Sequence, residues 1–155
     1  MPATKPTKFE DAVAELLSGN KLHNLLSFSN FLKDNKLTKS PSNKAKTSWT
    51  IKYKTNIICS LRFKEDFWVI SYFKNKGLLE KIDSHITTDM KSFILSNINT
   101  SPGCSGCGGT ENKMILGKMF DRVCSCHLLR LKEPEGVILE RAKELILICK
   151  GISER

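Results

Sequence analysis

Four of the six cysteines are concentrated in one part of the sequence and have the spacing of metal ligands. Cys104 and Cys107 form a Cys-x-x-Cys pair, and sixteen residues separate them from the Cys-x-Cys pair Cys124 and Cys126. A knuckle of this type turns two thiolates toward one ion, and a second pair about 15–20 residues away completes a tetrahedron. On a strand, Cys124 and Cys126 share a face while His127 projects the other way. The spacing predicts Zn²⁺ bound by the four cysteines, with Cys126 the ligand that the pattern specifies least.

Four thiolates would close the coordination shell of zinc, so the predicted site is structural. Two alternatives stay open. With only three bound cysteines, an open coordination position would allow Lewis-acid chemistry and a metal enzyme. Without metal, Cys104 and Cys107 would form a redox dithiol and the chain would be a thiol redox sensor, although Gly108 and Gly109 argue against a helix starting there. The sequence thus leaves enzymatic activity uncertain and favours a non-catalytic protein.

The elements that would position these cysteines are strands and helices arranged in blocks. Three segments predict antiparallel strands joined by tight turns. Side chains alternate in character along residues 49–54 and 57–63, and residues 67–73 are apolar on both faces. Two further strands are expected at residues 114–120 and 123–131, around a turn at Asp121 and Arg122. The Gly-rich residues 99–112 form a break before them.

Helices are expected at the N-terminus, after residue 87 and at the C-terminus. Thr7 and Glu10 have the spacing of a capping box, and Asn20 would cap a second helix. Either Thr87 or Thr88 would cap the third helix. A final helix would begin near Pro134 and extend to about Lys150, with Gly151 ending it. Cys59 and Cys149 fall on apolar faces and are expected in the core.

These elements predict an α+β fold with a mainly antiparallel sheet of about five strands, packed by helices and carrying a zinc knuckle. The length of 155 residues fits one domain. Within it, residues 1–34 would form N-terminal helices and residues 35–47 a basic linker. Residues 48–155 would hold the sheet, the cysteine cluster and the C-terminal helix.

The chain is basic, with a formal net charge of +9, and most of the excess lies in residues 1–54. Excess positive charge favours weak, salt-sensitive binding to nucleic acid, which makes a nucleic-acid-associated protein a further alternative. The candidate residues for that contact are Lys39, Lys44, Lys46, Lys52 and Lys54. The interleaved aromatic residues fall on the opposite face of the strand from Lys52 and Lys54 and are better explained as core.

Aromatic residues on the predicted strands could line a cavity for a small molecule. The candidates are Trp49, Tyr53, Trp68 and Tyr72, whose polar tips could orient a ligand. No convergent charged group accompanies them in the sequence, so ordinary core packing is the favoured interpretation.

Composition excludes several classes of protein. The apolar fraction of 40% is too high for a disordered chain, and the longest apolar run is far shorter than the roughly 20 residues of a membrane span. The N-terminus lacks the apolar segment of a secretory signal. We therefore expect a cytoplasmic protein with reduced thiols, not bound to a membrane.

The C-terminal two-thirds of the chain resembles a family of small uncharacterised bacterial α+β proteins. The resemblance rests on Ser48-Trp49-Thr-Ile51-Lys-Tyr53, the Cys104/Cys107 pair and the block Gly117-Lys-x-Phe120-Asp-x-Val-Cys124. It implies an α+β fold and a metal site but no reaction, because the family has no established activity. Taken together, the sequence predicts a small zinc-binding module of unknown role that binds a small molecule or a protein partner.

Overall fold

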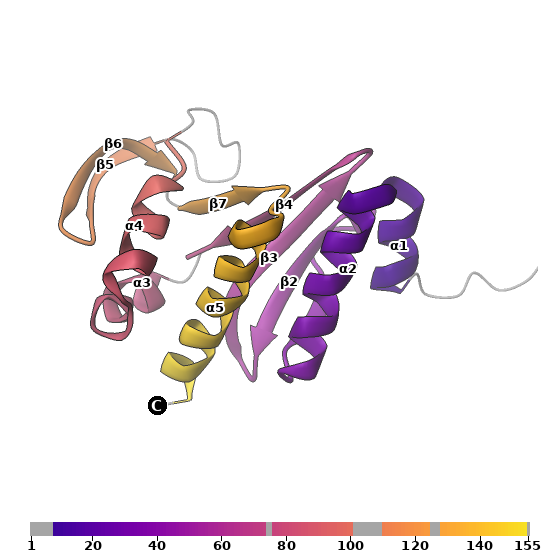
Figure 1. The fold of residues 1–155 in the computed structure, drawn as a ribbon, viewed down its shortest axis with the longest axis horizontal. Coiled ribbons are helices and arrows are strands. Elements are labelled where there is room, and N and C mark those ends of the chain that lie inside the picture. The colour runs from indigo at the N-terminus through magenta and orange to yellow at the C-terminus, as the bar shows by residue number, and fades with distance from the viewer. Residues whose placement is uncertain (1–7, 74–75, 101–109, 125–127, 155) are drawn as a thin grey trace, which may run out of the picture.

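The computed structural model describes residues 8–73, 76–100, 110–124 and 128–154. These residues form five α-helices and seven strands (Figure 1). The helices are α1 (Phe9–Leu16), α2 (Gly19–Asp34), α3 (Lys76–Ile82), α4 (Thr88–Ser96) and α5 (Gly136–Ser153). The strands are β1 (Thr38–Pro41), β2 (Ser48–Tyr53), β3 (Asn56–Lys64), β4 (Phe67–Tyr72), β5 (Thr110–Ile115), β6 (Lys118–Cys124) and β7 (Leu129–Lys132).

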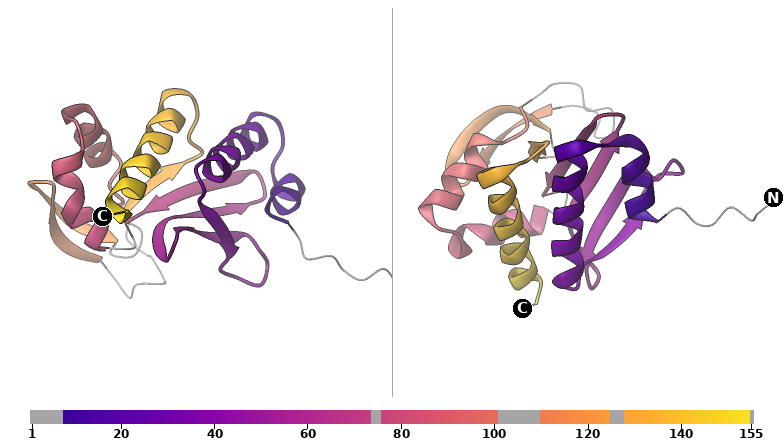
Figure 2. Two further views of the ribbon diagram at one scale, coloured as in Figure 1. Left: turned by 90° about the horizontal axis from the view of Figure 1, so that it is seen from below. Right: turned by 45° about the vertical axis from the view of Figure 1, so that its right-hand side comes forward.

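The strands form a main sheet of five and a separate hairpin of two. The main sheet has the order β1-β2-β3-β4-β7, and all of its neighbours are antiparallel. The hairpin consists of β5 and β6 and lies beside α4, at the end of the molecule remote from α1 (Figures 1 and 2). The predicted α+β class with a mainly antiparallel sheet is confirmed.

Helices α1, α2 and α5 cover one face of the main sheet, which we call the helix face (Figure 2). Apolar residues of the strands alternate onto this face and pack against apolar residues of the helices. The buried set includes Trp49, Ile51, Leu61, Phe63, Trp68, Ile70, Tyr72, Leu25, Phe28, Leu32, Leu145 and Ile146. In β2 every second side chain is removed from water, which explains its period-two pattern. Strand β4 is instead buried on both faces, as its continuous apolar run predicts.

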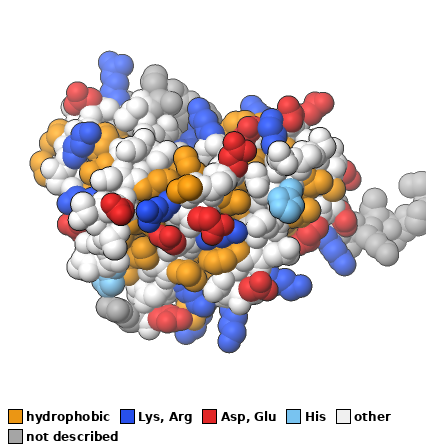
Figure 3. All heavy atoms as spheres, viewed as in Figure 1, with side chains coloured by type: hydrophobic (Ala, Val, Ile, Leu, Met, Phe, Trp, Pro, Cys, Tyr) orange, Lys and Arg blue, Asp and Glu red, His pale blue; other side chains and the backbone are white. Residues whose placement is uncertain are grey.

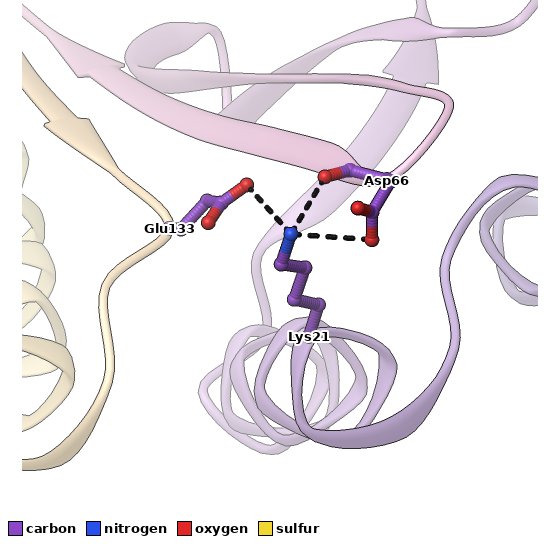
Figure 4. Close-up of polar contacts among 3 residues, drawn as sticks. All are labelled: Lys21, Asp66 and Glu133. Atoms are coloured by element: carbon purple, nitrogen blue, oxygen red, sulfur yellow. Dashed lines mark hydrogen bonds and ion pairs between the residues drawn. The ribbon is translucent and has the colours of Figure 1, made fainter.

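Lys21 of α2 links three parts of the main sheet region. Its ammonium group donates to the backbone oxygen of Asp66 at 2.8 Å, and it lies 3.1 Å from the Asp66 carboxylate and 3.4 Å from that of Glu133 (Figure 4). Asp66 belongs to the β3–β4 turn, and Glu133 follows β7. One side chain thus joins a helix to the turn and to the sheet edge.

Three predictions about strands are wrong. Thr38–Pro41, within the expected linker, form β1, an edge strand whose pairing with β2 outweighs its low strand propensity. The expected strand at 123–131 is not continuous, since β6 ends at Cys124 and β7 starts at Leu129 in the other sheet. The hairpin also turns at Leu116 and Gly117, not at Asp121 and Arg122.

The two-residue turn explains the hairpin geometry. Leu116 and Gly117 have φ values of 48° and 84°, the left-handed conformation that twists a hairpin correctly. Asp121 and Arg122 instead lie at an irregularity of the ladder, where the register shifts opposite Asn112. The Asn112 side-chain oxygen accepts a hydrogen bond from the Arg122 amide at 3.2 Å. The polar residues Asp121 and Arg122 thus mark a bulge within a strand, which a sequence pattern does not distinguish from a turn.

The ends of several helices also differ from the predicted ones. Thr87 is the confirmed cap of α4, because its hydroxyl accepts a hydrogen bond from the Met90 amide at 3.1 Å. Helix α2 begins after Ser18, so the prediction of Asn20 as its cap is wrong. Helix α5 continues through Gly151 to Ser153, and helix α3 was not expected. The predicted Thr7 cap lies outside the described residues.

Candidate functional site

The cysteine cluster lies only partly within the described residues. Cys124 is the last residue of β6, and its Cα partner across the hairpin is Thr110, the first residue of β5. Cys104, Cys107 and Cys126 lie outside the described residues. Elsewhere in the described chain, no group of three or more His, Cys, Asp or Glu side chains could hold a metal ion.

The hairpin register relates the one described cysteine of the cluster to the start of β5. Thr110, the Cα partner of Cys124, follows Cys107 by three residues in the sequence. Cys104 and Cys107 thus precede β5 along the chain, and Cys126 follows β6.

The other two cysteines belong to the core of the main sheet region. Cys59 of β3 and Cys149 of α5 are both buried free thiols, as predicted from their apolar faces. Burial raises the pKa of Cys149 to about 12 and raises the pKa of Cys59 well above its usual value. Both thiols stay protonated at neutral pH and lack the thiolate character that reactive cysteines need.

The four candidate aromatic residues occupy different parts of the core. The Trp49 ring contacts Phe9 of α1 edge-on, with centroids 5.2 Å apart, whereas Trp68 lies 6.4 Å from Phe28 of α2. Tyr72 donates a hydrogen bond to the Ala142 carbonyl in α5. These three side chains are buried. They are spread beneath three helices.

The polar tips of these aromatic residues are used within the protein. The Trp49 indole donates to the Lys46 carbonyl at 2.7 Å, and the Tyr53 hydroxyl donates to the Glu154 carboxylate at 2.8 Å. That contact with Glu154 is the main cause that raises the pKa of Tyr53. The four residues therefore offer no common polar group to a ligand.

The candidate lysines do not form one surface. Lys39 is on the helix face, with its ammonium 5.3 Å from the centroid of the Phe9 ring, and burial lowers its pKa. Lys54 lies in the β2–β3 turn, 5.4 Å from the Tyr53 ring centroid. Lys44 is exposed and Lys46 half-buried in the β1–β2 connection. Lys52 alone among the five projects from the sheet face that the helices leave uncovered.

That second sheet face carries a group of cations of which the sequence analysis nominated only Lys52. The strands of the main sheet contain no Asp or Glu, and five of their six Lys and Arg residues project from the face opposite the helices. We call this surface the basic face; its cations are Lys52, Arg62, Lys64, Arg130 and Lys132. The period of two places cations of one strand on a common side, but the sheet order decides which strands are neighbours.

Two open pockets lie elsewhere on the molecule. One is between α2 and α5, where Lys143 donates to the Ser27 hydroxyl at 3.2 Å and both residues line the pocket. The other lies between the end of α3 and the end of α5 and includes His85 and Ile152. Neither pocket contains a residue that the sequence nominated, and their polar groups form no recognisable catalytic arrangement.

Membrane attachment through a spanning helix has no support in the described chain, because none of its helices is both long and apolar enough. Comparisons with known proteins do not identify a relative: no family model, curated protein or solved structure matches the chain. The resemblance to the small bacterial α+β family therefore stays a prediction.

Proposed function

We propose that the protein is a non-catalytic binding module stabilised by a structural Zn²⁺ bound to Cys104, Cys107, Cys124 and Cys126. One observation carries this proposal. The pairing of Thr110 with Cys124 sets the first residue of β5, which follows Cys104 and Cys107 closely in the sequence, opposite the last residue of β6. Four thiolates of this spacing suit zinc and leave no open coordination position for catalysis.

The burial of the hairpin supports a structural role for the metal. Of its described side chains, Ile115 and Val123 are the buried apolar ones, and Met114 and Met119 are 60% and 57% exposed. A two-stranded hairpin with so little apolar burial is marginally stable by itself. Zinc binding contributes about 10–16 kcal/mol in small metal domains, which is ample to stabilise this end of the hairpin.

Thiol counting with metal analysis tests the proposal directly. We expect one zinc per chain and no reactive thiol in the native protein. After chelation, four thiols should react, whereas Cys59 and Cys149 should react only after unfolding, because both are buried. A metal-free protein that undergoes a two-electron oxidation would instead support the redox alternative and contradict ours.

Matched cysteine substitutions locate the ligands. Cys104→Ser should abolish zinc binding, and Cys149→Ser should retain one zinc per chain even though it perturbs the core. Cys126→Ser tests the least certain ligand: loss of zinc supports the four-cysteine site. Full zinc retention in Cys126→Ser would show a site with three cysteines and reopen the metal-enzyme alternative.

A further inference from the structure

The five cations of the basic face form no ion pair with any residue that the structure describes. By contrast, acidic and basic side chains are interspersed on the opposite side of the molecule, the helix side (Figure 3). The described strands therefore concentrate unneutralised positive charge on one surface, which favours a polyanionic ligand.

The sheet register arranges four of these cations in two lines. Arg62 and Lys64 are two residues apart on β3, and Arg130 and Lys132 are two residues apart on β7. Such neighbours are about 6.7 Å apart along a strand. Strand β4 separates the lines, so they are about 9.6 Å apart across the sheet. Arg62, Lys64 and Lys132 are exposed, and Arg130 is half-buried.

Hydroxyl groups lie beside the cations. The register aligns Ser40, Thr50, Ser60 and Ser71 across four strands, and Arg130 continues this row on β7. Serine and threonine hydroxyls, together with lysine and arginine, are the groups that commonly contact phosphates and sugars of nucleic acids. One partly exposed aromatic ring, Phe67, lies at the end of the face with the Lys64 ammonium 5.2 Å from its centroid.

The shape of the face favours a single strand over a duplex or a membrane. Four strands span about 14 Å, which is wider than the roughly 12 Å major groove of DNA, so this surface cannot enter the groove broadside. Membrane-surface binding needs protruding apolar groups, but Val69, between Arg62 and Lys132 in the register, is 1% exposed. A flexible strand can instead follow both lines of cations.

We propose that the basic face binds the sugar-phosphate backbone of single-stranded RNA, with Arg62, Lys64, Arg130 and Lys132 contacting phosphates. The accessible hydroxyls of the row, those of Ser40, Thr50 and Ser60, contact phosphate and ribose oxygens, whereas Ser71 is buried. This binding does not depend on base identity, because the described residues of the face include one partly exposed ring and no set of side chains arranged to read base edges. It does not require the proposed metal site, whose described ligand, Cys124, belongs to the separate hairpin.

The test measures binding of a fluorescently labelled 12-nucleotide oligouridylate by anisotropy at 50 and 200 mM salt. If the four cations contact phosphates, the logarithm of affinity should fall with the logarithm of salt concentration with a slope of about −2.8. Affinity should therefore fall about fiftyfold over this range. Failure to bind at 50 mM salt would overturn the proposal.

Three double variants of equal net charge distinguish the effect of the position of the cations on affinity from the effect of total charge. Arg62→Gln with Lys132→Gln changes the basic face, Lys8→Gln with Lys33→Gln changes exposed helix-side residues, and Lys44→Gln with Lys46→Gln changes the β1–β2 connection. The first pair should weaken binding about tenfold at 50 mM salt and flatten the slope by about 1.4. The other two pairs should change affinity less than about twofold.

Several results would contradict the proposed contact. Equal losses in all three pairs would show that total charge alone governs binding, and a larger loss in the Lys44/Lys46 pair would place the contact in the connection. Equal or tighter binding of a duplex of the same length would overturn single-strand preference. Equal binding of a polyglutamate peptide of matched charge would show a general acidic-polymer surface.

Discussion

The main sheet and the β5–β6 hairpin are stabilised in different ways. The main sheet packs one face against α1, α2 and α5 and buries rings such as Phe63, Trp68 and Tyr72. The hairpin pairs its strands well, yet the cross-strand partners Met114 and Met119 are both largely exposed. Backbone pairing alone thus builds a hairpin, but among the described residues only the main sheet has a substantial core, and Cys124 lies in the hairpin, where apolar burial is small.

The largest expected effect comes from removing a core ring. Trp68→Ala should lower the free energy of unfolding by about 3–5 kcal/mol and increase hydrogen exchange throughout the main sheet. Ile115→Ala is the matched change in the hairpin and should increase exchange there, with a global loss below about 1 kcal/mol. Urea unfolding and amide exchange measure both. Equal global losses would show that the two regions unfold as one unit.

Alkaline pH should destabilise the main sheet region selectively. The folded pKa values of Cys59 and Cys149 are raised, so their stabilising effect is complete below the unfolded thiol pKa and decreases as pH rises toward the folded value of about 12 for Cys149. Above pH 9, each pH unit should remove about 1.4 kcal/mol per buried thiol.

Urea unfolding between pH 7 and pH 10 in reducing buffer measures this effect. Cys149→Ala is the control and should remove part of the pH dependence, because alanine does not ionise in the unfolded chain. An unchanged slope in that variant would contradict the assignment of the alkaline loss to the thiols.

A smaller effect is expected from the buried hydroxyl of Tyr72. Tyr72→Phe removes its hydrogen bond to the Ala142 carbonyl and should lower the free energy of unfolding by about 1 kcal/mol. Exchange should increase in α5 and β4 and remain unchanged in the hairpin. The matched change Tyr53→Phe removes an exposed contact and should have less effect. The opposite order would contradict the role of burial.

The smallest effect is expected from Lys21. Lys21→Met removes exposed ion pairs with Asp66 and Glu133, which solvent screens strongly, so global stability should decrease only slightly. Exchange at the β3–β4 turn should nevertheless increase, because the Asp66 carbonyl loses its hydrogen bond. A loss as large as that of Trp68→Ala would show that this contact is a major stabilising element.

Much of the main sheet could be predicted because the pattern and the packing agree. Residues of β2 alternate between the core and the more exposed face, β4 is buried on both faces as its apolar run predicts, and Thr87 caps its helix through a purely local hydrogen bond. The edge strand β1 and helix α3 could not be predicted in this way. Thr38–Pro41 have no strong strand preference, and their conformation depends on an edge of β2 that is available to pair with them.

The candidate sites also differ in how far the sequence predicts them. The spacing of the four cysteines can be recognised in the sequence, and the bound metal remains a prediction that the experiments above test. The basic face could not be recognised from the sequence as one surface. Arg62 and Lys132 are 70 positions apart in the sequence, and only the order β3-β4-β7 places their strands on either side of β4.

Local chemistry in the sequence determined the α+β class, the β2–β3–β4 meander, the buried thiols at Cys59 and Cys149 and the ligand-like spacing of the other cysteines. Periodicity and capping act over a few residues, so they can be recognised before any fold is known. Tertiary structure alone decided the edge strand, the separation of the hairpin and the gathering of cations on one face. Those features depend on which distant segments pair, and that choice is made by the packing of the whole core.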